Sequence, residues 1–218
     1  MLPKVVWQMP RKGTFNLHAS LLPDYRGAAP INWAIIGGEA TTGVTTFLID
    51  EQIDTGAILL RKKVAIAPRE TAGTLPDKVM TVGADLVVET LALIASDKAV
   101  PQSQPKQVVE KSAPKIHKET SHIPWEQSLA QIDRFVRGMS PYPTAWAQLH
   151  HEGETYAVKI YEATPQEATH NLPIGRVLLE DKQIKVAVQG GFLKIESLQF
   201  PSKKRMSARE FLNGFHFA

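Results

Sequence analysis

Hydrophobic and polar residues alternate over residues 15–19, and this period of two is typical of a β-strand. Phe15 and Leu17 alternate there with Asn16 and His18. Because successive side chains of a strand point to opposite faces, we expect Asn16 and His18 to lie on the same face. The pattern therefore predicts an amide and an imidazole that project together near the end of a strand.

The rest of the first hundred residues carries both helix and strand patterns. Pro30 stands where a helix would begin and Gly37 where it would end. A run rich in β-branched residues after Gly43 favours a strand, and apolar residues at helical spacing after Thr74 favour a long amphipathic helix. The expected elements are a short helix at 2–9, a strand at 15–19, a helix at 30–36, strands at 43–50 and 57–67, and a helix at 74–96.

The last hundred residues show short strand patterns separated by turn signals such as Gly153 and Gly190-Gly191. About five short strands with one or two helices suggest a small β-barrel. Ser207 and Glu210 have the spacing of a capping box at the start of a final helix. The expected elements are a helix at 128–139, strands at 145–150, 155–161, 176–180, 184–189 and 192–200, and a helix at 207–215.

Residues 98–115 differ from both halves, since this segment is polar, contains three prolines and has no hydrophobic period. Such a composition is typical of a linker. The sequence therefore predicts one domain at 1–97, a linker at 98–115 and a second domain at 116–218.

The composition is that of a globular protein, with 43% hydrophobic and 22% charged residues. The chain has no cysteine, which excludes disulfides and thiolate sites and fits a cytoplasmic protein. No apolar run reaches the length that spans a bilayer, and the first residues do not form the apolar core of a signal peptide. The net charge of +3 arises after residue 100 and favours a nucleic-acid partner only weakly.

The candidate chemistry combines Asn16 and His18 with Asp54, a carboxylate that begins the turn Asp54-Thr55-Gly56. An amide can donate to an oxygen that becomes negative, an imidazole can donate or move a proton, and a carboxylate can orient the imidazole or accept a proton. The sequence contains no Gly-x-Ser-x-Gly elbow, which favours direct attack of an external nucleophile on a carbonyl over an acyl-enzyme route. One His and one Asp make a poor metal site, and the other histidines lack metal-ligand spacing, so we expect no metal.

Residues 16–23 together with Tyr25-Arg26-Gly27 resemble the signature of the 10-formyltetrahydrofolate-dependent formyltransferases. Residues 28–34 and 42–45 narrow the resemblance to the branch that formylates methionyl-tRNA. The second half resembles the C-terminal domain of that branch at residues 123–125, 137–146 and 206–214.

The resemblance implies a catalytic trio and a loop that contacts the folate. Asn16, His18 and Asp54 match the trio, in which the first two stabilise an oxyanion and the carboxylate holds the histidine and helps to remove the amine proton. The loop is matched by Ser20, Leu21, Leu22 and Pro23.

The implied fold is α/β: the C-terminal portion of a doubly wound, Rossmann-like formyltransferase domain at 1–97, followed by an OB-like β-barrel at 116–218 that binds tRNA. The implied reaction carries the formyl group of 10-formyltetrahydrofolate, the co-substrate, to the α-amine of initiator methionyl-tRNA. We expect a cytoplasmic monomer that needs neither a metal nor a membrane. The family's catalytic domain begins with strands and helices upstream of those found here, so we expect the isolated chain to fold poorly and to show little activity.

Two cationic sites leave alternatives open. Arg26 is either a surface cation or a substrate contact. Lys203, Lys204 and Arg205 lie in a polar turn with no obvious internal partners, so they form either an ordinary solvated turn or a contact to tRNA phosphates.

Two other functions compete with the leading one. The first is a formyltransferase for a small amine, such as an amino sugar or a purine precursor. The second is a non-catalytic tRNA-binding remnant that has lost folate binding.

Overall fold

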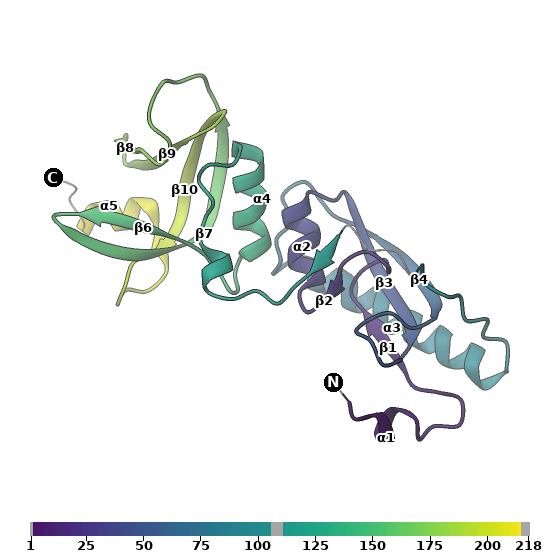
Figure 1. Cartoon of the computed structure of the whole chain (residues 1–218). Coiled ribbons are helices and arrows are strands. Elements are labelled where there is room, and N and C mark those ends of the chain that lie inside the picture. The colour runs from purple at the N-terminus through teal and green to yellow at the C-terminus, as the bar shows by residue number, and fades with distance from the viewer. Residues whose placement is uncertain (1, 106–110, 215–218) are drawn as a thin grey trace. The chain divides into compact units, whose positions relative to one another are not determined.

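The computed structural model describes residues 2–105 and 111–214, which divide into two compact units (Figure 1). The first unit contains residues 1–70 and 74–115, and the second contains residues 71–73 and 116–218. The chain is a mixed α/β protein, as expected. The assignment of functions to its parts stays a prediction.

The first unit is built on a three-stranded antiparallel sheet with the order β1-β3-β4. The strands are β1 (Phe15–His18), β3 (Thr41–Leu48) and β4 (Ile58–Ala65), which confirms the three strands that the sequence predicts here. All residues from 42 to 47 are buried, because the central strand β3 is covered on both faces.

The long helix α3 (Leu75–Ala95) lies against β3 and β4 and buries Val79, Gly83 and Leu86 toward them. The hydroxyls of Thr46 and Thr90 bond across this contact at 2.8 Å. Two shorter helices, α1 (Lys4–Trp7) and α2 (Pro30–Gly37), also lie where the sequence predicts them. In the described part of the chain, no helix is long and apolar enough to cross a membrane.

The segment 98–115 makes specific contacts with the first unit through its described residues. The backbone of Gln102 exchanges two hydrogen bonds of 2.8 Å with Ile58. Further along, β5 (Ser112–Ala113) forms a parallel pair with β2 (Arg26–Gly27). Residues 106–110 of the predicted linker lie outside the described residues. The described ends of this segment are therefore part of the fold of the first unit.

The second unit is a six-stranded antiparallel sheet with a helix against it. Its strands follow the order β6-β7-β10-β9-β8, with the short strand β11 added to β10. Each of the five predicted strands is present. The bounds are β6 (Ala145–His151), β7 (Glu154–Glu167), β8 (Val177–Glu180), β9 (Gln183–Val188), β10 (Gly191–Gln199) and β11 (Met206–Ser207).

Two helices of the second unit begin with the side-chain caps that favour a helix start. In α4 (Leu129–Met139) the caps are Ser128 and Gln131, and the helix lies against β7 and β10. In α5 (Ala208–Gly214) the predicted capping box is confirmed, since the Glu210 carboxylate accepts from the backbone and the hydroxyl of Ser207 at 2.8 Å each. A short 3-10 turn spans Glu119–Ser121.

Glu70 is a buried carboxylate that fixes the chain just before α3. It accepts hydrogen bonds from the backbone of Ala67 at 3.0 Å, from the Thr74 hydroxyl at 3.2 Å and from Lys78 Nζ at 2.5 Å. Burial raises the pKa of Glu70, but these hydrogen bonds and the Lys78 charge outweigh burial, so the pKa lies below its ordinary value.

We predict that Glu70→Gln lowers the free energy of unfolding by about 1–2 kcal/mol at pH 7, because the variant loses the charged acceptor. A carboxylate with a lowered pKa stabilises the fold above its ordinary pKa of about 4.3, and this contribution disappears as the pH falls through the folded-state pKa. Urea unfolding of both proteins at pH 7 and pH 3 should therefore show a larger difference at the higher pH. Glu51→Gln, which breaks an exposed pair with Lys4, is the control and should cost less than about 0.5 kcal/mol. An equal loss at both pH values would contradict the prediction.

Candidate active site

Asn16 and Asp54 line the same cavity, an open hollow of about 430 Å³ in the first unit. Asn16 lies on β1 opposite Phe47 of β3, and its side chain is exposed. Asp54 lies on the loop between β3 and β4. The cavity combines apolar and polar walls, and its lining residues are Leu2, Lys4, Trp7, Asn16, Phe47, Ile49, Asp50, Glu51, Gln52, Ile53 and Asp54.

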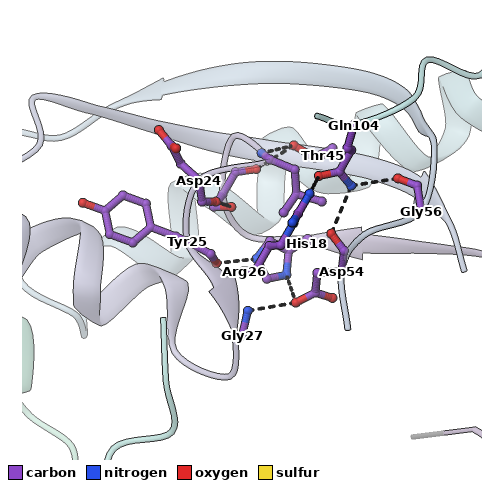
Figure 2. A network of polar contacts seen from close by, with 11 residues as sticks. His18, Asp24, Tyr25, Arg26, Gly27, Thr45, Asp54, Gly56 and Gln104 are labelled. Carbon is purple, nitrogen blue, oxygen red and sulfur yellow. Dashed lines mark hydrogen bonds and ion pairs between the residues drawn. The ribbon is translucent and has the colours of Figure 1, made fainter. Parts of the chain in front are cut away.

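His18 is buried, and both of its ring nitrogens face oxygen atoms (Figure 2). Its Nε2 lies 2.8 Å from the carbonyl oxygen of Tyr25. A carbonyl oxygen can only accept, so Nε2 must carry a proton. The other nitrogen, Nδ1, lies 3.6 Å from Asp54 Oδ2. The geometry thus leaves Nδ1 as the ring nitrogen that can exchange a proton with a neighbouring group.

Tyr25 holds the carbonyl that His18 contacts, and it is itself fixed by a charged network. Its hydroxyl donates to Glu39 Oε1 at 2.7 Å, and Lys111 Nζ donates to the same atom at 2.7 Å. Burial and the neighbouring Glu39 carboxylate raise the pKa of the Tyr25 hydroxyl. Burial opposes ionisation of Glu39, but the bonds from Lys111 and Tyr25 outweigh it and lower its pKa. The ring of Tyr25 is therefore anchored as a neutral phenol on an ionised carboxylate.

The turn Asp54-Thr55-Gly56 is held by close backbone approaches. Asp54 has a φ of +56°, in the left-handed region that few non-glycine residues adopt. Its Oδ2 accepts a hydrogen bond of 2.9 Å from the backbone N–H of Gly27. A Cβ on Gly27 would lie 2.3 Å from the oxygen of Ala113, and a Cβ on Gly56 would lie 1.7 Å from the oxygen of Leu48. Both glycines are required because backbone carbonyls occupy the space of a side chain.

Gln104 connects this turn to Arg26, and the sequence did not single it out. Its Oε1 accepts from Arg26 Nη2 at 2.6 Å, and its Nε2 donates to the carbonyls of Asp54 and Gly56 at 3.0 and 2.7 Å (Figure 2). Arg26 Nε is buried and has no hydrogen-bond partner in the described structure. Arg26 is therefore part of the site's interior support and not a simple surface cation.

The four residues that the resemblance assigns to folate contact have different environments. Ser20 and Leu22 are fully buried, whereas Leu21 and Pro23 are partly exposed. The Ser20 hydroxyl donates to the carbonyl of Asp24 at 2.6 Å, and Leu22 belongs to the core. Leu21 and Pro23 are thus the two of these residues that solvent partly reaches.

The basic turn before β11 also contains residues of two kinds. Lys203 and Lys204 are exposed. Arg205 instead donates to Ser197 Oγ at 2.9 Å and to Glu162 Oε1 at 2.5 Å, and its guanidinium lies 4.6 Å from the ring centroid of Tyr161. The expectation that all three cations lack internal partners is wrong for Arg205, since a neighbouring strand supplies a carboxylate and an aromatic face.

The titratable side chains of residues 2–105 and 111–214 form no cluster of three His, Cys, Asp or Glu that could hold a metal ion. The polar groups of the site are instead an amide, an imidazole, a carboxylate and backbone N–H groups. Such a set can donate hydrogen bonds to a developing negative charge and can accept one proton.

Comparison with known families gives matches over both units. Residues 1–91 match the family model for formyl transferases, and residues 115–216 match that for the formyl transferase C-terminal domain. The chain is 50% identical to the methionyl-tRNA formyltransferase of Flavobacterium johnsoniae over 218 residues, which are 100% of this chain and 69% of that relative. It is 52% identical to the methionyl-tRNA formyltransferase of Parabacteroides distasonis over 221 residues, which cover 99% of this chain and 68% of the relative.

Among solved structures, HypX from Aquifex aeolicus in complex with tetrahydrofolic acid has a similar fold, with a TM-score of 0.68 and 22% identity. The match covers 94% of this chain and 36% of that chain. At this level of identity the similarity concerns the fold alone.

We predict that Gly56→Ala displaces the Asp54 turn and destabilises the first unit by about 2 kcal/mol or more, because the new methyl group would overlap the Leu48 carbonyl. Thermal unfolding monitored by circular dichroism measures the loss. Gly214→Ala is the matched control, since a Cβ there meets no atom within 4 Å. If the Gly56→Ala protein unfolds at the wild-type temperature, the turn can accommodate a methyl group and the prediction is wrong.

Proposed function

Because the chain belongs to the formyl transferase family, we propose that it transfers the formyl group of 10-formyltetrahydrofolate to the α-amine of initiator methionyl-tRNA. The observation that carries this proposal is the roughly 50% identity to methionyl-tRNA formyltransferases along the whole chain. The substrate assignment rests on these relatives, since the neighbour that holds tetrahydrofolic acid is similar only in fold. Acting on charged tRNA, the protein would work in the cytoplasm, and we propose that it does so as a monomer.

We further propose that the first unit carries the chemistry and the second binds tRNA. In this proposal the first unit is the C-terminal portion of a doubly wound domain, and the six-stranded sheet of the second unit is an OB-like barrel. The residues 98–115 remain the connection between them. Two parts of this segment also stabilise the first unit: Gln102 pairs with Ile58 of β4, and β5 pairs with β2.

The reaction replaces one carbon–nitrogen bond with another. The amine nitrogen of methionine attacks the formyl carbon, and the formyl oxygen becomes negative in a tetrahedral intermediate. The intermediate then collapses, the bond between the formyl carbon and N10 of the folate breaks, and N10 takes up a proton while the amine loses one. The site must therefore stabilise an oxyanion and move a proton.

Asn16 and His18 are proposed to stabilise the oxyanion. The Asn16 amide lies at the cavity and can donate directly. For His18 to donate as well, the donor must be Nδ1–H, because Nε2–H is already bound to the Tyr25 carbonyl. A ring with both protons is cationic, and its Nδ1–H would face the Asp54 carboxylate, whose Oδ2 lies 3.6 Å from Nδ1. A donor of this kind lowers a barrier by about 3–4 kcal/mol.

Asp54 is proposed to hold His18 and to help to remove the amine proton. Its Oδ2 is oriented by the Gly27 N–H and faces the imidazole. The second oxygen, Oδ1, would then receive the amine proton, directly or through water. The carboxylate keeps its orientation during this step because the backbone carbonyls of Asp54 and Gly56 both accept hydrogen bonds from Gln104 Nε2.

For the folate we propose contact with the loop 20–23 and with the 430 Å³ cavity. Ser20 and Leu22 would shape the loop from inside, and Leu21 and Pro23 would touch the ligand. The cavity has a volume within the range of about 300–1,000 Å³ that is usual for small-molecule sites.

We predict that Asp54→Asn lowers kcat for formylation of initiator methionyl-tRNA by about 100-fold or more, with little change in KM, because the amide cannot accept the proton. Asp85→Asn, which removes an exposed carboxylate on α3 outside the cavity, should leave kcat within about twofold. The assay measures formyl transfer from 10-formyltetrahydrofolate to the charged tRNA. An equally active Asp54→Asn protein would remove Asp54 from the chemistry.

The same assay with a nucleotide-linked amino sugar as acceptor tests the substrate class. Transfer to the sugar and not to the charged tRNA would overturn the proposed function. Binding of tRNA without binding of a folate analogue would favour the non-catalytic alternative.

We propose that Lys203 and Lys204 contact tRNA phosphates, with Arg205 supporting the turn. The double variant Lys203→Glu/Lys204→Glu should weaken tRNA binding about tenfold or more and reduce the salt dependence of log Kd by about 1–2 units of slope. Lys63→Glu/Lys98→Glu changes the net charge equally at exposed positions of the first unit and serves as the control. Filter-binding titrations at several salt concentrations measure both quantities. An unchanged affinity and slope would exclude the turn from the interface.

A further inference from the structure

Gln104 makes three hydrogen bonds with its side-chain amide within the candidate site. Its oxygen accepts one bond from Arg26, and its nitrogen donates one bond each to Asp54 and Gly56. The two donated bonds end on backbone carbonyls of the turn and not on side chains. An amide is the side chain that suits this position, because it offers an acceptor to a cation and two donors to carbonyls.

The turn that Gln104 holds is strained and carries the carboxylate. Asp54 adopts a φ of +56°, and a conformation of this kind persists only where the surroundings fix it. The surroundings are Gln104 on the backbone side and the Gly27 N–H on the carboxylate side. Without Gln104, one of these two restraints disappears and the direction of Oδ2 toward His18 is less well fixed.

Gln104 reaches this position because its own segment is fixed two residues earlier. The backbone of Gln102 forms two hydrogen bonds of 2.8 Å with Ile58, at the start of β4. The side chain of Gln102 is exposed. The two glutamines therefore differ in role: Gln102 acts through its backbone, and Gln104 acts through its side chain.

We propose that Gln104 is a positioning residue for formyl transfer: it holds the Asp54 turn so that the carboxylate stays aligned with His18 Nδ1, and it couples this turn to Arg26. The inference rests on the proposed function, since it assigns Gln104 a part in that reaction. Gln104 does not touch the reacting atoms. It acts through Asp54, and the reaction itself is unchanged.

Two substitutions separate the contact of Gln104 with Arg26 from its contacts with the Asp54 turn. Gln104→Ala removes all three hydrogen bonds. Gln104→Glu keeps an acceptor for Arg26 but places carboxylate oxygens against the carbonyls of Asp54 and Gly56. Because the proposed effect passes through the turn, both variants should lower kcat by about 10- to 100-fold while the KM values for folate and tRNA change less than about twofold. Gln102→Ala should retain wild-type kcat.

A second measurement does not depend on turnover. The ¹⁵N resonances of the His18 ring, assigned with a His18→Gln protein, report the surroundings of Nδ1 and Nε2. In Gln104→Ala and Gln104→Glu the Nδ1 resonance should shift because Asp54 has moved, and in Gln102→Ala it should not. Unfolding curves establish that each variant is folded at the temperature of measurement.

Three results would overturn the inference: a wild-type His18 spectrum in both Gln104 variants, an unaltered kcat in Gln104→Ala, or full activity in Gln104→Glu. Full activity in Gln104→Glu would indicate that the contact with Arg26, and not the contacts with the Asp54 turn, is what the reaction requires. A wild-type chain that binds neither charged initiator tRNA nor a folate analogue would contradict the proposed function instead. In that case the His18 spectra still decide whether Gln104 positions the Asp54 turn.

Discussion

Asp54 keeps its backbone in a left-handed conformation that costs a non-glycine residue about 1–2 kcal/mol. The first unit offsets this cost with contacts from three directions. Gln104 bonds the backbone of the turn, Gly27 bonds the carboxylate, and Gly56 lets the chain pass beside the Leu48 carbonyl. As a result, the Asp54 carboxylate points from the β3–β4 loop toward His18 on β1. A relaxed turn would not fix that direction.

The histidine is constrained in a complementary way. Its Nε2 proton is bound to the Tyr25 carbonyl, and Tyr25 is anchored through Glu39 and Lys111. The ring can therefore neither turn over nor exchange the functions of its nitrogens without breaking a buried hydrogen bond. One nitrogen is bound to a backbone carbonyl, and the other faces the Asp54 carboxylate. In the proposed reaction the second nitrogen would be the proton donor.

The periodic parts of the chain could be predicted from the sequence, whereas the supports of the site could not. The strand period placed Asn16 and His18, and helical spacing placed α3, because these patterns are local. The contacts of Gln104 join residues 48, 50 and 78 positions apart, in a segment whose polarity indicated only a linker. Arg205 was misjudged for the same reason, since its carboxylate partner lies 43 residues away on another strand. Loop residues 20–23 have no period, so the burial of Ser20 and Leu22 gave no signal.

These long-range contacts show that residues 16–27 and the Asp54 turn do not fix the geometry of the candidate site by themselves. Short local segments contain the amide, the imidazole and the carboxylate. The positions of these groups relative to one another depend on contacts with residues far away in the sequence. The segment after α3 provides two of these contacts. Gln104 bonds to the Asp54 turn, and β5 pairs with the strand that contains Gly27. A chain that kept residues 16–56 and lost this segment would retain the reactive groups, yet Asp54 and Gly27 would lose the partners that align them. The described supports of the candidate site therefore include Gln104 and Ala113, which lie after residue 97, the predicted end of the first domain.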